Sequence, residues 1–395
     1  MSIHETPTAE RTHIGFFGAR NAGKSSIVNA VTGQPFSIVS DVAGTTTDAV
    51  SKSMELLPLG PVNITDTAGF DDEGTLGAMR IEKTRLALYR TDIAVLVTDG
   101  TRPMGATEQT LIELFTQQKI PYLVVRNKAD LLSEPQTDTD EVLWVSAKTG
   151  QGIHGLKERI GAMGSHLQPT RHIVSDLLQP NDTVVLVTPI DAAAPKGRLI
   201  LPQQQTLREV IDIGGIAVVT QPEQLPQVLT NLKKAPRMII TDSQVFGPVE
   251  KMLPDDIPLT SFSILMARYK GFLETAVQGI EALRKLPDGA KLLIAEGCTH
   301  HRQCGDIGTV KLPKLLQAYT GRKFDFSFTA GGDFPEDLSR YGLVVHCGGC
   351  MRTEREMSWR MRTALSQGVP FTNYGIALAA CNGILERALM RGTLT

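Results

Sequence analysis

Several features that define special classes of protein are scarce in this sequence. Only five cysteines occur in 395 residues, and an odd number in so long a chain does not fit a disulfide framework. No run of about 18 apolar residues is present, so we expect no membrane-spanning helix and no membrane partner. The first ten residues, MSIHETPTAE, are polar and lack the apolar core of a secretory signal. These absences favour a cytoplasmic protein.

The chain also lacks an excess of charge of either sign. Lysine and arginine number 40, aspartate and glutamate number 42, and the net charge is −2. Proteins that bind the phosphate backbone of RNA or DNA usually carry clustered positive charge, and this sequence has no such block. We therefore expect no nucleic-acid partner. Apolar residues make up 42%, which is typical of a globular protein with sizeable cores.

Apolar runs alternate with helical stretches, which is typical of α/β domains with mainly parallel sheets. The length predicts two or three domains. Gly, Ser, Gln and Pro cluster at residues 164–171 and mark a first boundary, and a group of prolines from Pro248 to Pro258 marks a second. We predict an α/β fold class, with a larger first domain (1–168) followed by two smaller α/β domains (169–262 and 263–395).

The predicted elements follow this division. The first domain is expected to hold six strands and a closing helix, at residues 13–17, 50–56, 62–65, 93–98, 122–126, 143–145 and 153–163. The second should hold strands at 184–187, 216–219 and 238–240. The third should begin with one long helix at 264–286, continue with strands at 292–295 and 343–345, and close with a helix from Tyr374.

A phosphate-binding motif lies between the first predicted strand and a helix expected from Lys24. The segment Gly18-Ala-Arg-Asn-Ala-Gly23-Lys24-Ser25 matches G-x-x-x-x-G-K-[ST]. Its glycines let backbone N–H groups approach phosphates, and the helix N-terminus adds positive potential. Lys24 is expected at the β and γ phosphates, and the Ser25 hydroxyl at Mg²⁺.

Three further motifs follow predicted strands, where open α/β sheets bind ligands. The carboxylate of Asp66-Thr-Ala-Gly69 can hold the Mg²⁺ shell through water. The carboxylate of Asn127-Lys128-Ala-Asp130 can accept from guanine N1–H and the 2-amino group, a donor pair that adenine lacks. Ser146-Ala147-Lys148 can place a backbone N–H at guanine O6. The first domain (1–168) is therefore predicted to be a Ras-like P-loop GTPase domain. Its GTP/GDP site is predicted to be formed by Asn21, Ala22, Gly23, Lys24, Ser25, Ser26, Thr46, Asp66, Gly69, Asn127, Lys128, Asp130, Ser146, Ala147 and Lys148.

Details of this domain resemble the TrmE–Era branch of GTPases. Asp41-Val-Ala-Gly-Thr-Thr46-Thr-Asp48 is similar to the switch I of that branch, which implies that Thr46 binds Mg²⁺. Asn21 matches the asparagine that coordinates K⁺ in potassium-activated members; the alternative is a loop asparagine that stabilises a turn. Phe70 stands where Ras-type enzymes have a water-orienting glutamine. The resemblance implies slow, potassium-stimulated GTP hydrolysis.

The residue that positions the attacking water is open. The acidic residue that TrmE proteins use downstream falls at Ala78. Asp71, Asp72 and Glu73 are candidate substitutes, and the alternative is an ordinary solvated acidic loop.

Cysteine and histidine residues cluster near the C-terminal end of the chain. Cys298-Thr-His300 follows one predicted strand, and His346-Cys347-Gly-Gly-Cys350 follows another. If the two strands are neighbours in a parallel sheet, these residues converge at one edge. Three interpretations are open: buried free cysteines, a structural zinc site with three Cys and one His, and an iron–sulfur cluster.

The combination of these motifs resembles the HydF family of FeFe-hydrogenase maturation GTPases. The resemblance extends to Ala194-Pro-Lys-Gly-Arg-Leu-Ile-Leu-Pro202, to Asp306-Ile-Gly-Thr-Val-Lys-Leu-Pro313 and to Thr372-Asn-Tyr-Gly375, and so covers essentially the whole chain. It implies a scaffold that carries a 4Fe-4S cluster and a transient diiron precursor, which it delivers to FeFe-hydrogenase. The implied partners are radical-SAM maturases, the hydrogenase apoprotein and a second copy of the chain, bound through the middle domain.

Cluster ligands are assigned by this resemblance. Cys298, Cys347 and Cys350 would be the thiolate ligands, with His300 and His346 as tentative further ones. Cys304, His301 and Cys381 have no motif role. A rival hypothesis is an RNA-associated GTPase of tRNA modification or ribosome assembly with a zinc-stabilised C-terminal domain. The absence of a basic, aromatic-interleaved surface counts against it.

Overall fold

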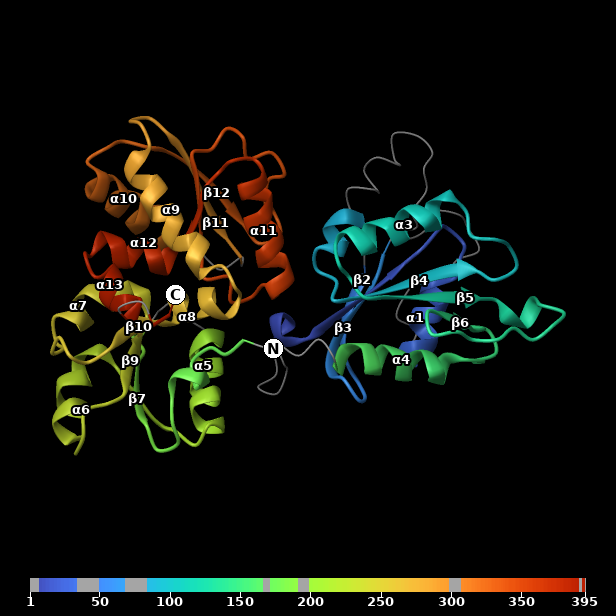
Figure 1. Cartoon of the computed structure of the whole chain (residues 1–395), viewed down its shortest axis with the longest axis horizontal. Helices are drawn as coiled ribbons and strands as arrows, with labels where there is room; N and C mark the ends of the chain where they lie inside the picture. Colours follow the sequence, from blue (N-terminus) through green and yellow to red (C-terminus); the bar gives the residue numbers. More distant parts are fainter. Residues whose placement is uncertain are drawn as a thin grey trace. The chain divides into compact units, whose positions relative to one another are not determined.

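The chain divides into two compact units, Met1–Pro169 and Thr170–Thr395 (Figure 1). The computed structural model describes residues 7–33, 50–67, 84–165, 171–190, 199–297, 307–390 and 393–394. The division lies next to the boundary expected after residue 168. The two later domains expected from the sequence belong to one compact unit.

The first unit is built on a six-stranded sheet of order β2-β3-β1-β4-β5-β6. Every neighbouring pair is parallel except β2 and β3, which are antiparallel. Consecutive residues of the central strand β4, from Ile93 to Val97, are all fully buried, as expected for a strand covered on both faces. The strands are β1 (Thr12–Phe17), β2 (Val50–Leu56), β3 (Gly60–Asp66), β4 (Ile93–Asp99), β5 (Tyr122–Asn127) and β6 (Val142–Trp144).

Helices cover both faces of this sheet. Helices α1 (Lys24–Thr32) and α4 (Ile153–Ser165) lie on one face and α3 (Ala106–Gln117) on the other (Figure 1). Two separate apolar clusters fill the two layers, one including Ile27 and Leu156 and the other including Leu111 and Phe115. The sheet therefore brings all the loops at its carboxyl edge to one side of a rigid core.

The second unit holds two four-stranded parallel sheets, of order β10-β9-β7-β8 and β12-β11-β13-β14. The strands are β7 (Thr183–Val187), β8 (Ile216–Thr220), β9 (Met238–Thr241), β10 (Leu259–Ser261), β11 (Lys291–Glu296), β12 (Asp325–Ala330), β13 (Leu343–His346) and β14 (Phe371–Asn373). The helices are α5 (Leu201–Asp212), α6 (Leu225–Asn231), α7 (Phe246–Glu250), α8 (Phe262–Tyr269), α9 (Leu273–Lys285), α10 (Leu312–Thr320), α11 (Glu354–Ser366), α12 (Tyr374–Cys381) and α13 (Leu385–Ala388). Within the described ranges, no helix has the length and apolar character needed to cross a bilayer.

The long helix expected at residues 264–286 is wrong. Two helices, α8 and α9, occupy this stretch, and the chain turns between them at Gly271, whose φ is +74°. A left-handed residue ends an α-helix, and glycine adopts that conformation without steric cost. The break leaves the side chain of Lys270 buried instead of on a helix surface.

The two strands that precede the cysteine motifs meet the condition under which those motifs can converge. β11 and β13 are parallel neighbours, with Ala295 opposite His346. Both strands therefore end at the same edge of their sheet. Helix α8 is tied to this sheet, because Asn373 Nδ2 at the end of β14 donates to the Ser263 carbonyl at 3.1 Å.

Candidate functional site

The phosphate-binding loop connects β1 to α1, as the sequence predicts. Helix α1 begins at Lys24, so its free N–H groups face the loop. The Lys24 side chain is 7% exposed, and its Nζ donates to the carbonyls of Gly18 at 3.0 Å and Ala19 at 2.9 Å. The lysine is thus held inside the loop, with its ammonium positioned for an anionic ligand.

The two expected magnesium-side groups lie together. Ser25 Oγ donates to Asp66 Oδ2 at 2.6 Å, and Asp66 is fully buried. Its other oxygen, Oδ1, is buried and has no hydrogen-bond partner among the described residues. An unpartnered carboxylate oxygen beside a hydroxyl fits a hydrated Mg²⁺ ion, which prefers oxygen ligands. Thr46, Gly69, Phe70, Asp71, Asp72, Glu73 and Ala78 lie outside the described residues.

The guanine-side motifs are brought together by Asn127. Its Nδ2 donates to the Ala22 carbonyl in the phosphate loop at 3.1 Å, and its Oδ1 accepts from the Ala147 N–H at 3.1 Å. Ser146 Oγ donates to Asp130 Oδ1 at 2.6 Å, which fixes one oxygen of that carboxylate. Three loops that are far apart in the sequence therefore form one site, as their strand-end positions predict.

An ion pair between Lys128 and Asp99, which was not predicted from the sequence, supports this site. Lys128 has a left-handed backbone, with φ +68°, and its Nζ lies 2.6 Å from Asp99 Oδ2. Burial alone would raise the pKa of Asp99, but hydrogen bonds from Lys128 and Thr101 lower it to about 2. The available signal was the position of Asp99 at the carboxyl end of β4, beside the strand that carries the Asn-Lys-x-Asp motif.

Asn21 and Lys148 lie at the edge of the nucleotide site. Both are exposed, and Asn21 adopts a left-handed backbone with φ +61°. This conformation fits a loop asparagine, and it leaves the amide accessible. The potassium role of Asn21 stays a prediction.

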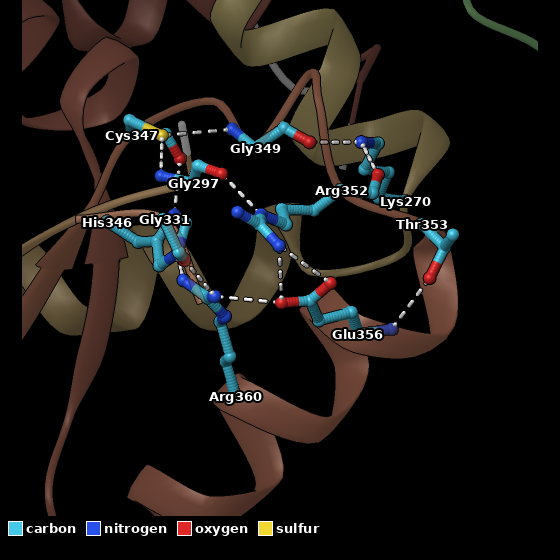
Figure 2. Close-up of polar contacts among 10 residues, drawn as sticks. All are labelled: Lys270, Gly297, Gly331, His346, Cys347, Gly349, Arg352, Thr353, Glu356 and Arg360. Carbon is cyan, nitrogen blue, oxygen red and sulfur yellow. Dashed lines mark hydrogen bonds and ion pairs between the residues drawn. The ribbon is translucent and has the colours of Figure 1, made fainter. Parts of the chain in front are cut away.

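The Cys347–Cys350 loop is held by main-chain donors that point at sulfur (Figure 2). Cys347 Sγ accepts from the N–H groups of Gly297, at 3.0 Å, and Gly349, at 3.4 Å. Gly349 has φ +63°, and a Cβ there would lie 2.5 Å from Met357 Sδ, so the turn requires glycine. N–H donors aimed at sulfur stabilise a thiolate more than a thiol. The loop therefore fits a thiolate-bound metal centre.

Burial opposes the charged form of these thiols. It raises the pKa of Cys347 and raises that of Cys350 to about 11. Cys347, Cys350 and Cys381 are all free of disulfides. The two loop cysteines are therefore protonated at neutral pH until a cation favours the thiolate, which is how metal binding couples to proton release.

His346 is fully buried, and both of its ring nitrogens are engaged. Nδ1–H donates to the Cys347 carbonyl at 2.8 Å, and Nε2 accepts from Arg360 Nη1 at 2.9 Å (Figure 2). Burial and the charge of Arg360 lower the pKa of His346 to about 3, so the ring is neutral. Iron could reach Nε2 only if Arg360 moved away, and the assignment of His346 as a ligand stays a prediction.

Buried charges that the sequence reading missed surround the loop. Glu356 accepts from Arg360 at 2.8 Å and from Arg352 at 3.2 Å, and Arg352 Nε donates to the Gly297 carbonyl. Lys270 Nζ donates to the carbonyls of Gly349 and Arg352. Burial lowers the pKa of Lys270 to about 8, although Cys350 and Cys347 act in the opposite direction. The i, i+4 spacing of Glu356 and Arg360 on helix α11 was the available signal for one of these pairs.

The other half of the expected metal site lies outside the described residues. These omitted residues are Cys298, His300, His301 and Cys304. Among the residues whose placement is described, no group of three His, Cys, Asp or Glu side chains forms a metal site. The structure therefore brings Gly297 to Cys347 and leaves the convergence of all three thiolates as a prediction.

Comparison with known families identifies the chain. Residues 173–271 match the family described as the Hydrogen maturase F dimerization domain, and residues 274–391 match the Hydrogen maturase F tetramerization domain. These two matches together span more than half of the chain. The chain belongs to the hydrogen maturase F (HydF) family. Residues 13–128 of this HydF-family chain match the 50S ribosome-binding GTPase family, and the predicted Ras-like fold of the first unit is confirmed.

This HydF-family chain also resembles proteins with other names. A tRNA modification GTPase MnmE from Laribacter hongkongensis is 34% identical over 154 residues, which cover 38% of this chain and 34% of that protein. GTPase Der from Wolinella succinogenes is 34% identical over 174 residues, which cover 40% of this chain and 36% of that protein. The chain thus spans about a third of the length of these curated relatives. A crystal structure of Era from Aquifex aeolicus bound to GDP.AlF4- matches with 17% identity and a TM-score of 0.36, over 55% of this chain and 97% of that one.

Proposed function

We propose that the chain is a GTP-hydrolysing scaffold of FeFe-hydrogenase maturation. It binds GTP and Mg²⁺ in its first unit and carries a 4Fe-4S cluster in its second. The observation that carries the proposal is the Cys347 sulfur held by two main-chain N–H groups in a HydF-family chain. Its cargo is a diiron precursor received from radical-SAM maturases and passed to the hydrogenase apoprotein.

Hydrolysis at the first unit depends on positioning and electrostatics. Lys24 holds the β and γ phosphates, and Asp130 with the Ala147 N–H selects guanine. Ser25 and Asp66, with Thr46, hold Mg²⁺, which neutralises charge on the phosphates when bound. Asn21 adds K⁺ to the same end of the site. Phe70 in place of a water-orienting glutamine makes the reaction slow.

The cluster is held by Cys298, Cys347 and Cys350 in this proposal. When bound, a cluster with three thiolates offers one iron whose remaining ligand can exchange, which suits a site that accepts and releases cargo. The chain's own residues orient the loop: His346 and Arg360 brace the strand end, and Gly297 and Gly349 donate to sulfur. His300 is the tentative further ligand, and the role of His346 is tested below.

Self-association and location complete the proposal. The matched descriptions name dimerization and tetramerization domains, which supports assembly into a homodimer and larger oligomers. Free cysteines and the absence of a disulfide among the described residues support a reducing cytoplasm as the working compartment.

Metal analysis of anaerobically purified protein tests the proposal against its rival. A scaffold should contain iron and acid-labile sulfide, and its reduced form should give an EPR spectrum of a 4Fe-4S cluster. An RNA-associated GTPase with a structural zinc site should be colourless, contain zinc and give no such spectrum. Zinc without sulfide in protein reconstituted with both metals would overturn the proposal.

A further inference from the structure

Lys270 is a buried lysine whose position the nucleotide and cysteine motifs do not explain. It follows the last residue of α8 and is 4% exposed. A buried ammonium is costly unless it is hydrogen-bonded and its charge is compensated. The groups around Lys270 should therefore indicate the role of its positive charge.

The hydrogen bonds of Lys270 bracket Cys350. Nζ donates to the Gly349 carbonyl, directly before Cys350, and to the Arg352 carbonyl at 2.6 Å, two residues after it (Figure 2). The Arg352 N–H in turn donates to the Gly349 carbonyl at 2.9 Å. The ammonium thus closes the turn that carries Cys350, and the same turn places the Gly349 N–H on Cys347 Sγ.

Among the described residues, the charges around the turn include more cations than carboxylates available to them. Lys270, Arg352 and Arg360 are the cations, and Glu356 is shared by the two arginines. Glu296, which accepts from Tyr374 Oη at 3.3 Å, is the other buried carboxylate near Cys347. Glu354, whose charge also acts on Lys270, is paired with Arg171 at 2.5 Å. The other three cations and two carboxylates leave one positive charge, and in the described part of the chain Lys270 forms no salt bridge. This excess of positive charge favours a bound anion.

Lys270 also connects two stretches of the chain that match different family descriptions. It lies in the stretch that matches the dimerization domain, residues 173–271, whereas the loop lies in the stretch that matches the tetramerization domain, residues 274–391. Helix α8 therefore supplies a group to a loop 79 residues later in the chain. The Cys347–Cys350 loop therefore depends on a hydrogen-bond donor from outside the stretch that matches the tetramerization domain.

We propose that Lys270 is the positioning residue of the cluster loop: it clamps the turn at Cys350 and supplies the buried positive charge that stabilises an anionic thiolate-bound cluster. The charge part rests on the proposed function, whereas the clamp exists in the metal-free protein. Because reduction adds negative charge to a cluster, a nearby cation raises the reduction potential.

Three variants of the full chain separate the clamp from the charge. Lys270→Met removes donors and charge, and Lys270→Gln removes the charge but keeps an amide donor. Lys285→Met, at the exposed end of α9, is the matched control. Hydrogen–deuterium exchange of the peptide containing residues 347–353 is measured without metal. Iron, sulfide and the EPR-monitored reduction potential are then measured after anaerobic reconstitution.

If Lys270 clamps the turn, amide hydrogens of residues 347–353 should exchange about tenfold faster in Lys270→Met. This ratio corresponds to about 1.4 kcal/mol. The increase should be smaller in Lys270→Gln. The charge predicts a lower reduction potential in both Lys270 variants, with Lys285→Met unchanged. If Lys270→Met does not fold, the exchange rate and the reduction potential of Lys270→Gln decide between the outcomes.

The positioning role of Lys270 and the proposed function would be overturned by different outcomes. Exchange and potential equal to those of Lys285→Met would overturn the positioning role of Lys270. A wild-type protein that takes up no iron and sulfide would overturn the proposed function, and with it the charge role, while the exchange experiment would still decide the clamp.

Discussion

Replacing Asp99 by Asn should weaken binding of guanine nucleotides without changing the preferred base. Asp99 Oδ2 holds Lys128 Nζ at 2.6 Å, and Lys128 belongs to the motif whose Asp130 is proposed to bind the base. Asparagine keeps the size of the side chain and an oxygen for Thr101, but it removes the negative charge. The lysine must then be ordered by the nucleotide alone.

The depressed pKa of Asp99 gives the size of the effect. The folded pKa is about 2, against about 3.9 for an unperturbed aspartate, and the difference corresponds to roughly 2–3 kcal/mol of stabilisation at neutral pH before screening by solvent is taken into account. Asp99 is partly exposed, so screening reduces this to about 1–2 kcal/mol. Because the folded value is the lower one, this stabilisation is present above about pH 4 and is lost as the pH falls towards 2. Bound nucleotide restores part of the lysine's order, so we expect a loss of GDP affinity of about tenfold, or about 1.4 kcal/mol.

Fluorescence titration with labelled GDP and labelled xanthosine diphosphate measures both affinity and base preference. Thr101→Ala is the matched control, because it removes a neutral hydrogen bond to Asp99 and keeps the ion pair. Unchanged GDP affinity in Asp99→Asn would refute the reasoning. A gain in preference for xanthosine diphosphate would show that the Asp130 carboxylate had moved instead.

The remaining predictions concern the base, the cation and the cluster. Asp130→Asn should cost roughly 1.5–3 kcal/mol of GTP binding, the value of a charge-assisted hydrogen bond, and should relax discrimination against xanthine nucleotides; titration with both nucleotides checks this. Potassium should accelerate GTP hydrolysis beyond sodium at equal ionic strength, and Asn21→Ala should abolish the difference; equal phosphate-release rates in wild type would contradict it. Cys347→Ser and Cys350→Ser should each lose most iron and sulfide, because a serine alkoxide is a poor iron ligand. His346→Ala should keep most of the iron and alter the EPR spectrum, since its Nε2 is bonded to an arginine; loss of iron equal to that of the serine variants would make the histidine a ligand.

The sequence predicted the elements that carry long apolar runs. The strand at residues 50–56 has the expected bounds, and most other strands of the first unit differ by one or two residues. β10 and β14 were missed because each has three residues of which only one is apolar, whereas all three residues of the equally short β6 are apolar. β12 was missed although its sequence, DFSFTA, alternates apolar and polar residues as an edge strand does. The break at Gly271 was missed because apolar residues continue on both sides of it.

The nucleotide site could be read from motifs because each motif is local and follows a strand. Asp99 and Lys128 are 29 residues apart, and Lys270 and its carbonyl partners are 79 and 82 residues apart. Such pairs leave no local pattern, because their separation is set by which strands are neighbours. For His346 the motif alone was misleading in another way. Its position indicated a metal ligand, but only the fold revealed the hydrogen bond from Arg360 to its Nε2.

The pairing of β11 with β13 has a consequence for the order of events during biosynthesis. The Gly297 N–H and the Cys347 sulfur are 50 residues apart, and they meet only when these two strands lie side by side. Ribosomal synthesis proceeds at roughly 5–20 residues per second, so the first strand waits for seconds before its partner emerges. Unlike a short metal finger, this loop cannot be assembled around an ion from adjacent residues. Loading of the proposed cluster would therefore follow completion of the sheet, and we expect a chain that stalls before residue 346 to retain no iron.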